Sequence, residues 1–326
     1  MAASRRIGHE AAMTRLNRFT RPTLRAFLPK ALAAALALGL AACAMSDAPP
    51  PQASGKDGLL VWPDLLKRER PEPTSSVAYG PSSLQVADLW LPQGAGPHPT
   101  VLMVHGGCWQ SEIADRRIMN WIAGDLRARG IAVWNIDYRG VDREGGGYPG
   151  TFLDAAAATD ALRDSAPRYN LDISRLVAVG HSAGGHLALW LAGRPRLPQG
   201  SPLRSANPLP IKTAISLGGL PDLEEAARPP GSGCGTEVID KISGGRFAET
   251  SVPRLAPLGV TQLLINGVED RIIPAAYAEG YAAPMRAAGD TVDVRMIPRT
   301  GHVELIAPES EAWKAAVAEI EKALGR

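Results

Sequence analysis

The sequence predicts an α/β fold in which a mostly parallel central β-sheet carries helices on both faces. Two observations lead to this prediction. Short apolar runs alternate with helix-like segments over roughly 250 residues, which is typical of strands joined by crossover helices. Most of these runs are apolar at every position rather than at every second one, as expected of strands buried on both faces of a sheet.

The strands and helices follow one another in a regular order. Residues 84–92 (LQVADLWLP) alternate apolar and polar side chains, which is typical of an antiparallel edge strand. Further strands are predicted at 99–107, 131–137, 175–180, 212–218, 261–267 and 292–298. Helices are predicted at 115–129, 151–165, 182–192, 275–288 and 309–324.

Residues 221–258 interrupt this alternation. The stretch is rich in Pro and Gly and has neither the period of a helix nor that of a strand. A long irregular segment inside a compact domain is usually functional. We therefore expect residues 221–258 to form a lid or cap.

The first 42 residues have the composition of an export signal. Seven basic residues accompany a short apolar core, 31–40, which is well below the roughly 20 residues of a membrane span. Glu10 is unusual in such a signal, so Met13 is an alternative start. The core ends in LAAC, which resembles the bacterial lipobox, in which the cysteine (here Cys43) is lipidated; ordinary cleavage after small residues is the alternative.

A lipid on Cys43 would anchor the chain to a membrane. By resemblance to lipoprotein sorting, Ala44 favours the outer membrane, with the protein facing the periplasm; a soluble periplasmic or secreted protein is the alternative. Residues 43–59 are rich in Pro, Ala and Ser and are expected to be a flexible tether. Residues 60–326 are then expected to form one domain.

The composition argues against several kinds of partner. The net charge of +2 includes the basic signal, and the chain after residue 42 has 28 basic and 32 acidic residues. It has no basic block, so nucleic acid is not expected as a partner. The glycine-rich stretch 145–150 lacks a following Lys-Ser/Thr, and no His/Cys/carboxylate cluster has zinc spacing, so neither a cofactor nor a metal is expected. The sequence does not set the oligomeric state.

The strongest chemical signal lies at residues 177–192 (VAVGHSAGGHLALWLA). An apolar strand runs into the turn GHSAG at 180–184, and a helix follows. A sharp strand–turn–helix strains its central residue and needs small neighbours. It lifts the hydroxyl of that residue above the sheet edge, at the start of a helix. This pattern predicts that Ser182 is a nucleophile.

A serine hydroxyl needs a base to take its proton. Of the six histidines, His302 follows the last predicted strand, where a loop can bring it over the sheet edge. His181 and His186 flank the serine, and we expect their side chains to point elsewhere. His302 is therefore the predicted base.

The third member of such a set is a carboxylate that orients the imidazole. Asp270 ends the run LLINGVED, after the penultimate strand and 32 residues before His302. Its neighbour Glu269 remains an alternative, whereas Asp290 and Asp293 are less well placed because they begin the next strand. The resulting chain order is nucleophile, acid, base.

The segment HGGCW (105–109) directly follows a buried strand. Glycines let backbone N–H groups approach the oxyanion of an acyl-transfer reaction, and each donor lowers the barrier by about 3 kcal/mol. We expect donors from Gly106, Gly107 and Cys108 on one side and from Ala183 on the other. A glycine turn without this role is the alternative.

These motifs resemble those of α/β-hydrolase esterases with an HGGxW motif, close to hormone-sensitive-lipase-like enzymes, feruloyl- and acetyl-esterase-like proteins and kynurenine formamidases. The resemblance covers about residues 76–326 and rests on HGGCW, IDYRG, GHSAGGHLA, GVED and GH, in this order. It implies the α/β-hydrolase fold and a metal-free serine hydrolase that forms an acyl-enzyme. The catalytic residues it implies are Ser182, Asp270 and His302.

The expected function is therefore hydrolysis of small-molecule carboxylic esters with small or medium acyl groups. An arylformamidase, a prolyl-oligopeptidase-like peptidase and a non-catalytic binding protein remain alternatives. Trp109 and Trp190 either line the acyl pocket or belong to the core, and we assign Trp109 to the pocket. Tyr138 and Arg139 are expected to brace the oxyanion loop.

Two cysteines remain once Cys43 is lipidated. An oxidising periplasm permits a disulfide between Cys108, in the oxyanion loop, and Cys234, in the expected lid. Such a bond would fix the lid to the site. The alternative is a buried Cys108 and an unrelated Cys234 in a mobile loop.

Overall fold

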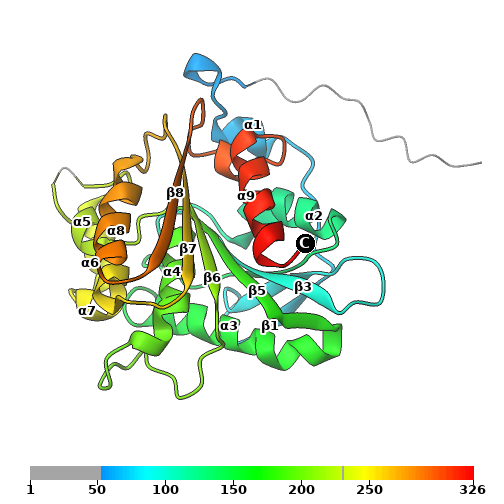
Figure 1. The fold of residues 1–326 in the computed structure, drawn as a ribbon, viewed down its shortest axis with the longest axis horizontal. Coiled ribbons are helices and arrows are strands. Elements are labelled where there is room, and N and C mark those ends of the chain that lie inside the picture. Colours follow the sequence, from blue (N-terminus) through cyan, green and yellow to red (C-terminus); the bar gives the residue numbers. More distant parts are fainter. Residues whose placement is uncertain (1–52, 230) are drawn as a thin grey trace, which may run out of the picture. The chain divides into compact units, whose positions relative to one another are not determined.

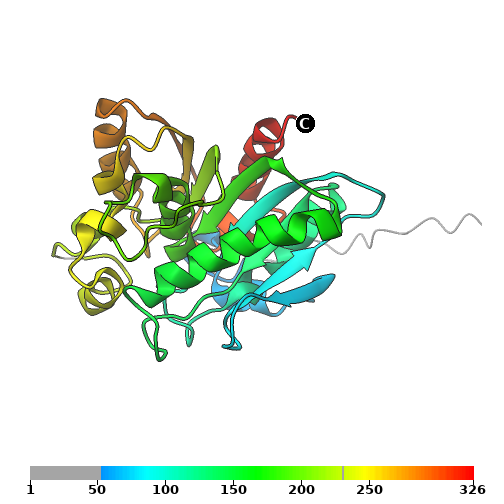
Figure 2. The same ribbon diagram turned by 90° about the horizontal axis from the view of Figure 1, so that it is seen from below.

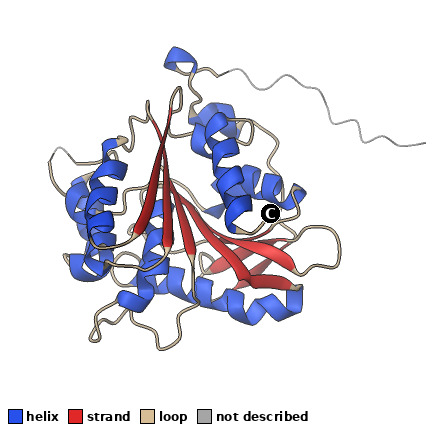
Figure 3. Cartoon of the chain, viewed as in Figure 1, coloured by secondary structure: helices blue, strands red, loops and turns tan. Residues whose placement is uncertain are grey.

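The computed structural model describes residues 53–229 and 231–326. Within these residues the chain forms an eight-stranded sheet of order β1-β2-β4-β3-β5-β6-β7-β8 (Figures 1 and 3). β2 pairs antiparallel with β1 and β4, and the other pairs are parallel. The predicted α/β class with a mostly parallel sheet is confirmed. The predicted signal (1–42), Cys43 and the tether up to residue 52 lie outside the described residues.

Each predicted strand and helix overlaps an observed one, with bounds that differ by up to five residues. The strands are β1 Ser75–Ala78, β2 Val86–Trp90, β3 His98–Val104, β4 Ala132–Ile136, β5 Leu171–His181, β6 Thr213–Leu217, β7 Thr261–Gly267 and β8 Thr291–Ile297. The α-helices are α1 Trp62–Leu66, α2 Asn120–Ala128, α3 Gly150–Tyr169, α4 Ala183–Gly193, α5 Leu223–Ala226, α6 Thr236–Ser243, α7 Phe247–Thr250, α8 Ala276–Ala287 and α9 Glu311–Ala323. None of the helices in 53–229 and 231–326 is long and apolar enough to cross a bilayer.

Two apolar clusters hold the helices to opposite faces of the sheet. Successive strand side chains alternate between them: in β3, Val101 and Met103 join one cluster, while Leu102 and Val104 join the other. Side chains of α2 and α9 complete the first cluster, and those of α3, α4, α6 and α8 complete the second. Figure 2 shows α3, in green, and α9, in red, on opposite sides of the sheet.

The edge of the sheet differs from the prediction. Residues 84–92 contain β2, which is antiparallel as predicted but lies second from the edge. The edge strand on this side of the sheet is β1, whose sequence SSVA is short and alternates between half-buried and exposed positions. Four residues with two serines carry too little apolar signal to indicate a strand.

The segment 221–258 is less irregular than the sequence predicts. Its described residues form α5, α6, α7 and a 3₁₀ turn at Val252–Leu255. Ile239, Ile242 and Val252 are fully buried, so these short helices pack into the domain. Figure 1 shows them, in yellow-green to yellow, beside α8.

Hydrogen bonds reach into the last residues of the expected tether. The backbone N–H of Ser54 donates to the carboxylate of Asp64, and the N–H of Gly55 donates to the carbonyl of Leu59, both at 3.0 Å. The N–H of Leu60 donates to Glu304, far along the chain. Hydrogen bonds therefore begin at Ser54, within the segment expected to be a tether up to residue 59.

Close packing of α4 against β3 generates a stability prediction. A Cβ on Gly184 would meet the carbonyl oxygens of Val104 and His105, whereas a Cβ on Gly280 in α8 would meet nothing within 4 Å. We expect Gly184→Ala to lower the free energy of unfolding by about 2 kcal/mol or more. The matched variant Gly280→Ala should raise it by about 0.5–1 kcal/mol, since alanine favours the helix.

Urea denaturation of both variants tests this packing. Equal stability of Gly184→Ala and the wild type would show that α4 does not lie this close to β3.

Candidate active site

Ser182 is the single residue between β5 and α4. Its backbone has φ 55° and ψ −124°, a conformation that costs a non-glycine residue of order 1–3 kcal/mol. The N–H of Ser182 donates to the carbonyl of Leu217 on β6 at 2.8 Å, and its carbonyl accepts from Gly185 at 2.8 Å. A Cβ on Gly106 would lie 2.8 Å from the Ser182 Cβ, so only glycine fits beside the serine. The turn is thus held from both sides.

His302 and Asp270 form a buried pair at the same end of the sheet. The His302 Nδ1 lies 2.6 Å from Asp270 Oδ2, and their side chains are 5% and 0% exposed. Because a carboxylate accepts, Nδ1–H is the donor and Nε2 keeps a free lone pair. The other oxygen of Asp270 accepts the N–H groups of Ile272 and Ile273, each at 2.9 Å. This arrangement fixes the carboxylate against the imidazole.

The structure distinguishes Asp270 from its neighbour. The carboxylate of Glu269 accepts the backbone N–H of Thr300 at 3.0 Å and so holds the loop that carries His302. Among the described residues, it is Asp270 rather than Glu269 that bonds to the imidazole.

Ser182 and His302 line one cavity of about 630 Å³. The oxyanion-loop residues Gly107 and Cys108 line it as well, and Gly233 comes from the segment 221–258. The structure therefore brings the predicted nucleophile, base and glycine loop around one space.

The oxyanion loop has an unusual backbone. Gly107, Cys108 and Trp109 have φ of 103°, 49° and 52°, so three successive residues lie in the left-handed region. Within the described chain, no protein acceptor takes the N–H of Gly107, Cys108 or Ala183. Ala183 is the first residue of α4, where N–H groups have no partner inside the helix. These N–H groups are therefore available to an oxygen of a ligand.

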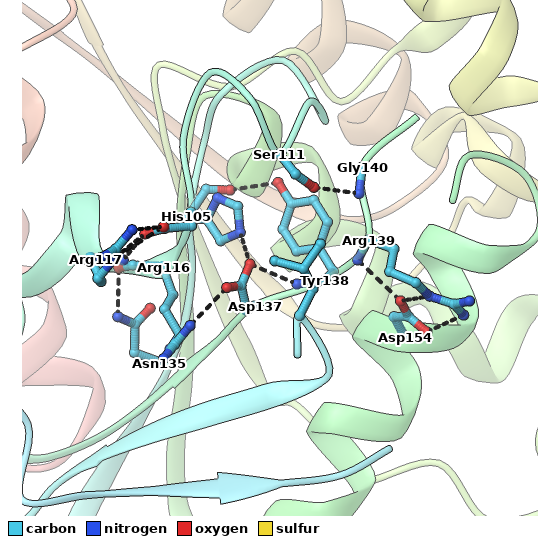
Figure 4. A network of polar contacts seen from close by, with 12 residues as sticks. His105, Ser111, Arg116, Arg117, Asn135, Asp137, Tyr138, Arg139, Gly140 and Asp154 are labelled. Carbon is cyan, nitrogen blue, oxygen red and sulfur yellow. Dashed lines mark hydrogen bonds and ion pairs between the residues drawn. The ribbon is translucent and has the colours of Figure 1, made fainter. Parts of the chain in front are cut away.

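A buried polar network supports the loop from below (Figure 4). The two ring nitrogens of His105 lie 2.7 Å from the Gly106 carbonyl and 3.0 Å from the Asp137 carboxylate. The hydroxyl of Tyr138 donates to the His105 carbonyl at 2.9 Å, and the two rings stack. Burial, aided by Asp137, raises the pKa of Tyr138 well above its usual value, so the hydroxyl remains a donor. Tyr138 braces the loop as predicted.

Arg139 supports the loop indirectly, through the residue that follows it. Its guanidinium binds both oxygens of Asp154 on α3, at 2.7 and 2.8 Å. The next residue, Gly140, donates its N–H to the hydroxyl of Ser111 at 2.9 Å. Arg139 thus holds the segment that contacts the oxyanion loop, as Figure 4 shows.

The assignment of Trp109 to the substrate pocket is wrong. Trp109 is fully buried in the core and packs edge-on against His186, with 5.4 Å between ring centroids. Trp190 is also a core residue, and its indole N–H donates to the Glu249 carbonyl at 2.8 Å. Both indoles face the apolar cluster behind the loop rather than the cavity.

His181 also differs from the prediction. Its ring lines the cavity, with its centroid 4.5 Å from that of His302, and its Nε2–H donates to the His302 carbonyl at 3.1 Å. Burial, together with His302, holds the pKa of His181 well below its usual range. His186 does point away: its Nε2–H donates to the Thr250 carbonyl, and burial lowers its pKa to about 4. His181 is therefore a neutral support for the loop that carries His302.

The sequence did not indicate the wall supplied by the N-terminal segment. Trp62 and Leu66 of α1 line the cavity, and Trp62 lies edge-on to His302 with 6.2 Å between ring centroids. The only local signal is a short helix with a proline as its second residue. Contact between residues 240 positions apart cannot be read from such a helix.

Cys108 and Cys234 are joined by a disulfide, with 5.3 Å between their Cα atoms. The bond ties the oxyanion loop to the stretch between α5 and α6. Of the two possibilities that the sequence leaves open, the structure has the bonded one.

Taken together, the strand order, the serine turn after β5 and the Asp–His pair after β7 and β8 define an α/β-hydrolase fold. Solved structures share this fold. Esterase B from Lactobacillus rhamnosis aligns with a TM-score of 0.65 and 20% identity, over 78% of this chain and 87% of that one. A truncated carbohydrate esterase from gut microbiota aligns with a TM-score of 0.63 and 18% identity, over 79% and 100%.

Sequence comparison is more specific but covers less of the chain. Residues 87–228 match the BD-FAE family model. Carboxylesterase NlhH of Mycobacterium tuberculosis is 30% identical over 141 residues, which is 43% of each chain. The chain therefore matches less than half the length of this curated relative. The family match includes the oxyanion loop and Ser182 but ends before Asp270 and His302.

The disulfide generates a stability prediction. It closes a loop of 126 residues, which by the chain-entropy model stabilises the fold by roughly 4–5 kcal/mol. We expect dithiothreitol to lower the melting temperature by about 10 °C, as measured by circular dichroism. The double variant Cys108→Ala/Cys234→Ala should melt at the lower temperature with or without the reductant. Free thiols at both Cys108 and Cys234, in denatured protein that was made in an oxidising compartment and kept unreduced, would contradict the bond.

Proposed function

We propose that this protein is a serine carboxylesterase for small-molecule esters with small or medium acyl groups. The observation that carries the proposal is one cavity lined by Ser182, His302 and the oxyanion loop, with Asp270 bonded to His302. The matches to the BD-FAE model and to carboxylesterase NlhH support this class of reaction. A cavity of about 630 Å³ suits a small or medium substrate.

In the proposed mechanism, the Ser182 oxygen attacks the ester carbonyl carbon while His302 Nε2 takes the hydroxyl proton. The carbonyl π bond opens to an oxyanion, which accepts hydrogen bonds from Gly107, Cys108 and Ala183. When the carbon–oxygen bond to the alcohol breaks, His302 gives its proton to the departing oxygen. Asp270 keeps the imidazole in the correct tautomer and stabilises its positive charge.

The acyl-enzyme is then hydrolysed by the same sequence of steps, with water as the nucleophile. His302 takes a proton from water, and the resulting nucleophile attacks the acyl carbon. Collapse of the second oxyanion breaks the bond to Ser182 and returns the proton to its oxygen. The products are a carboxylic acid and an alcohol.

The other candidate functions would use the same residues. Arylformamide or peptide hydrolysis differs in the bond cleaved, so a panel of nitrophenyl esters, N-formylkynurenine and acetylated xylan separates them. A binding protein would not need a strained serine, a buried Asp–His pair and free N–H donors in one cavity. These three features favour an enzyme.

The mechanism predicts the effect of single substitutions. Ser182→Ala and His302→Ala should each lower kcat for 4-nitrophenyl butyrate by about 10³-fold or more, because the three residues act as a unit. Asp270→Asn should cause a loss of similar size through the wrong tautomer. Glu269→Gln, the matched control, should cost far less. An unchanged rate in Ser182→Ala, or a larger loss in Glu269→Gln than in Asp270→Asn, would refute this assignment.

We also propose that the chain is exported and lipid-anchored at Cys43, in the outer membrane and facing the periplasm. The motif at residues 40–43 and the apolar core before it support this proposal. A disulfide between Cys108 and Cys234 suits an oxidising compartment.

Radiolabelled palmitate tests the anchor. The full-length protein should take up the label in a Gram-negative host and fractionate with membranes. Cys43→Ser should lose the label and change its membrane retention, whereas the double variant lacking Cys108 and Cys234 should keep the label. A wild-type protein without label would overturn the lipid anchor.

A further inference from the structure

The cavity at Ser182 carries an excess of positive charge. Arg70, Arg117 and Arg271 line it, and among the described lining residues Asp115 is the one carboxylate. We propose that Arg70, assisted by Arg271, binds a carboxylate of the substrate, so that the preferred ester is a monoanion. This inference rests on the proposed esterase function and deepens it by naming the substrate class.

Arg117 is already neutralised within the protein. Its Nε lies 3.0 Å from each oxygen of Asp115, and a terminal nitrogen lies 2.5 Å from one of them. The N–H of Arg117 also donates to the same carboxylate at 2.8 Å. Since Asp115 is paired with Arg117, it does not neutralise Arg70 or Arg271, and these two guanidinium groups can bind an anionic ligand.

Arg70 is positioned but not paired. Its guanidinium lies over the Trp121 ring, 5.1 Å from the centroid, and its Nε is buried without a hydrogen-bond partner. Within the described chain, no carboxylate lies within 4.0 Å of its nitrogens. Stacking on an indole fixes the plane of the guanidinium, and its two terminal nitrogens can donate to the two oxygens of a carboxylate.

Arg271 supplies a second guanidinium, whose ion pair within the protein is weak. It directly follows Asp270 and is paired with Asp57 at 3.6 Å, with side chains that are 71% and 64% exposed. An exposed pair at this distance contributes less than about 1 kcal/mol, so a substrate carboxylate can compete for the guanidinium. Asp270 does not pair with the Arg271 guanidinium, since His302 and two backbone N–H groups occupy its oxygens.

The rest of the wall is apolar. Trp62, Leu66, Ile113, Ile118 and Ile272 line the cavity around these arginines. Leu66 and Ile113 are 49% and 60% exposed, which leaves apolar surface at the rim. Apolar walls lower the local dielectric and strengthen an ion pair beside them. The cavity thus fits an ester with an apolar body and one negative charge.

Matched ester pairs test this proposal, because the members of each pair have similar size and differ mainly in one carboxylate. On the acyl side the pair is 4-nitrophenyl hexanoate and mono-4-nitrophenyl adipate; on the alcohol side it is 4-methylphenyl acetate and 4-acetoxybenzoate. The measured quantity is the ratio of kcat/KM for the anionic ester to that for the neutral one. Using both pairs identifies whether the acyl or the alcohol part carries the recognised charge.

We expect Arg70→Gln to lower this ratio about tenfold for at least one pair, mainly through KM for the anionic ester. Arg271→Gln should lower it about threefold, and Arg70→Lys should restore part of the loss. Salt at 0.5 M should lower the wild-type ratio by screening. Arg196→Gln is the matched control: this exposed arginine lies just beyond the far end of α4 and should leave the ratio unchanged.

Other outcomes would overturn the proposal in distinguishable ways. A ratio that is the same in wild type, Arg70→Gln and Arg271→Gln would show that the cavity does not select for charge, while ester hydrolysis would stand. An equal loss for both members of each pair would show that Arg70 only supports the fold through Trp121. A wild-type protein that hydrolyses none of the four esters would overturn the esterase function together with this inference.

Discussion

The geometry of the site depends on the close approach of α4 to the sheet at Ser182. A backbone with φ 55° points the serine out of the line of β5, and it persists because glycines at 106, 180 and 184 leave no side chains in the way. The turn sets three things at once: the place of the hydroxyl, the free N–H of Ala183 and the start of α4. The other parts of the site are arranged around that fixed point.

The oxyanion loop is held by three kinds of contact that compensate for its left-handed backbone. His105 and Tyr138 support it from the sheet through buried hydrogen bonds. Trp109 anchors it in the apolar core, and the disulfide of Cys108 ties it to the segment after α5. A loop restrained in this way can present N–H groups without reorganising as charge develops on a substrate oxygen.

The cavity is assembled from parts of the chain that lie far apart. Its nucleophile and base follow the carboxyl ends of different strands, β5 and β8. Trp62 and Leu66 of α1 come from the beginning of the domain. Neutral His181 packs beside the His302 ring and donates a hydrogen bond to the His302 carbonyl. The catalytic residues therefore lie at the carboxyl ends of the strands, whereas loops and the N-terminal segment determine the shape and charge of the cavity.

The sequence alone determined the features that local patterns encode. Continuous apolar runs gave the buried strands, and the glycine spacing around Ser182 gave the turn, because both depend on neighbouring residues. The tertiary structure decided what depends on distant contacts: that Asp270 and not Glu269 meets His302, that Trp109 lies in the core, and that Cys108 meets Cys234. It also decided that β1 forms the edge and that Arg70 faces the cavity. These features depend on packing between segments that lie far apart in the chain, and a local sequence pattern does not specify such contacts.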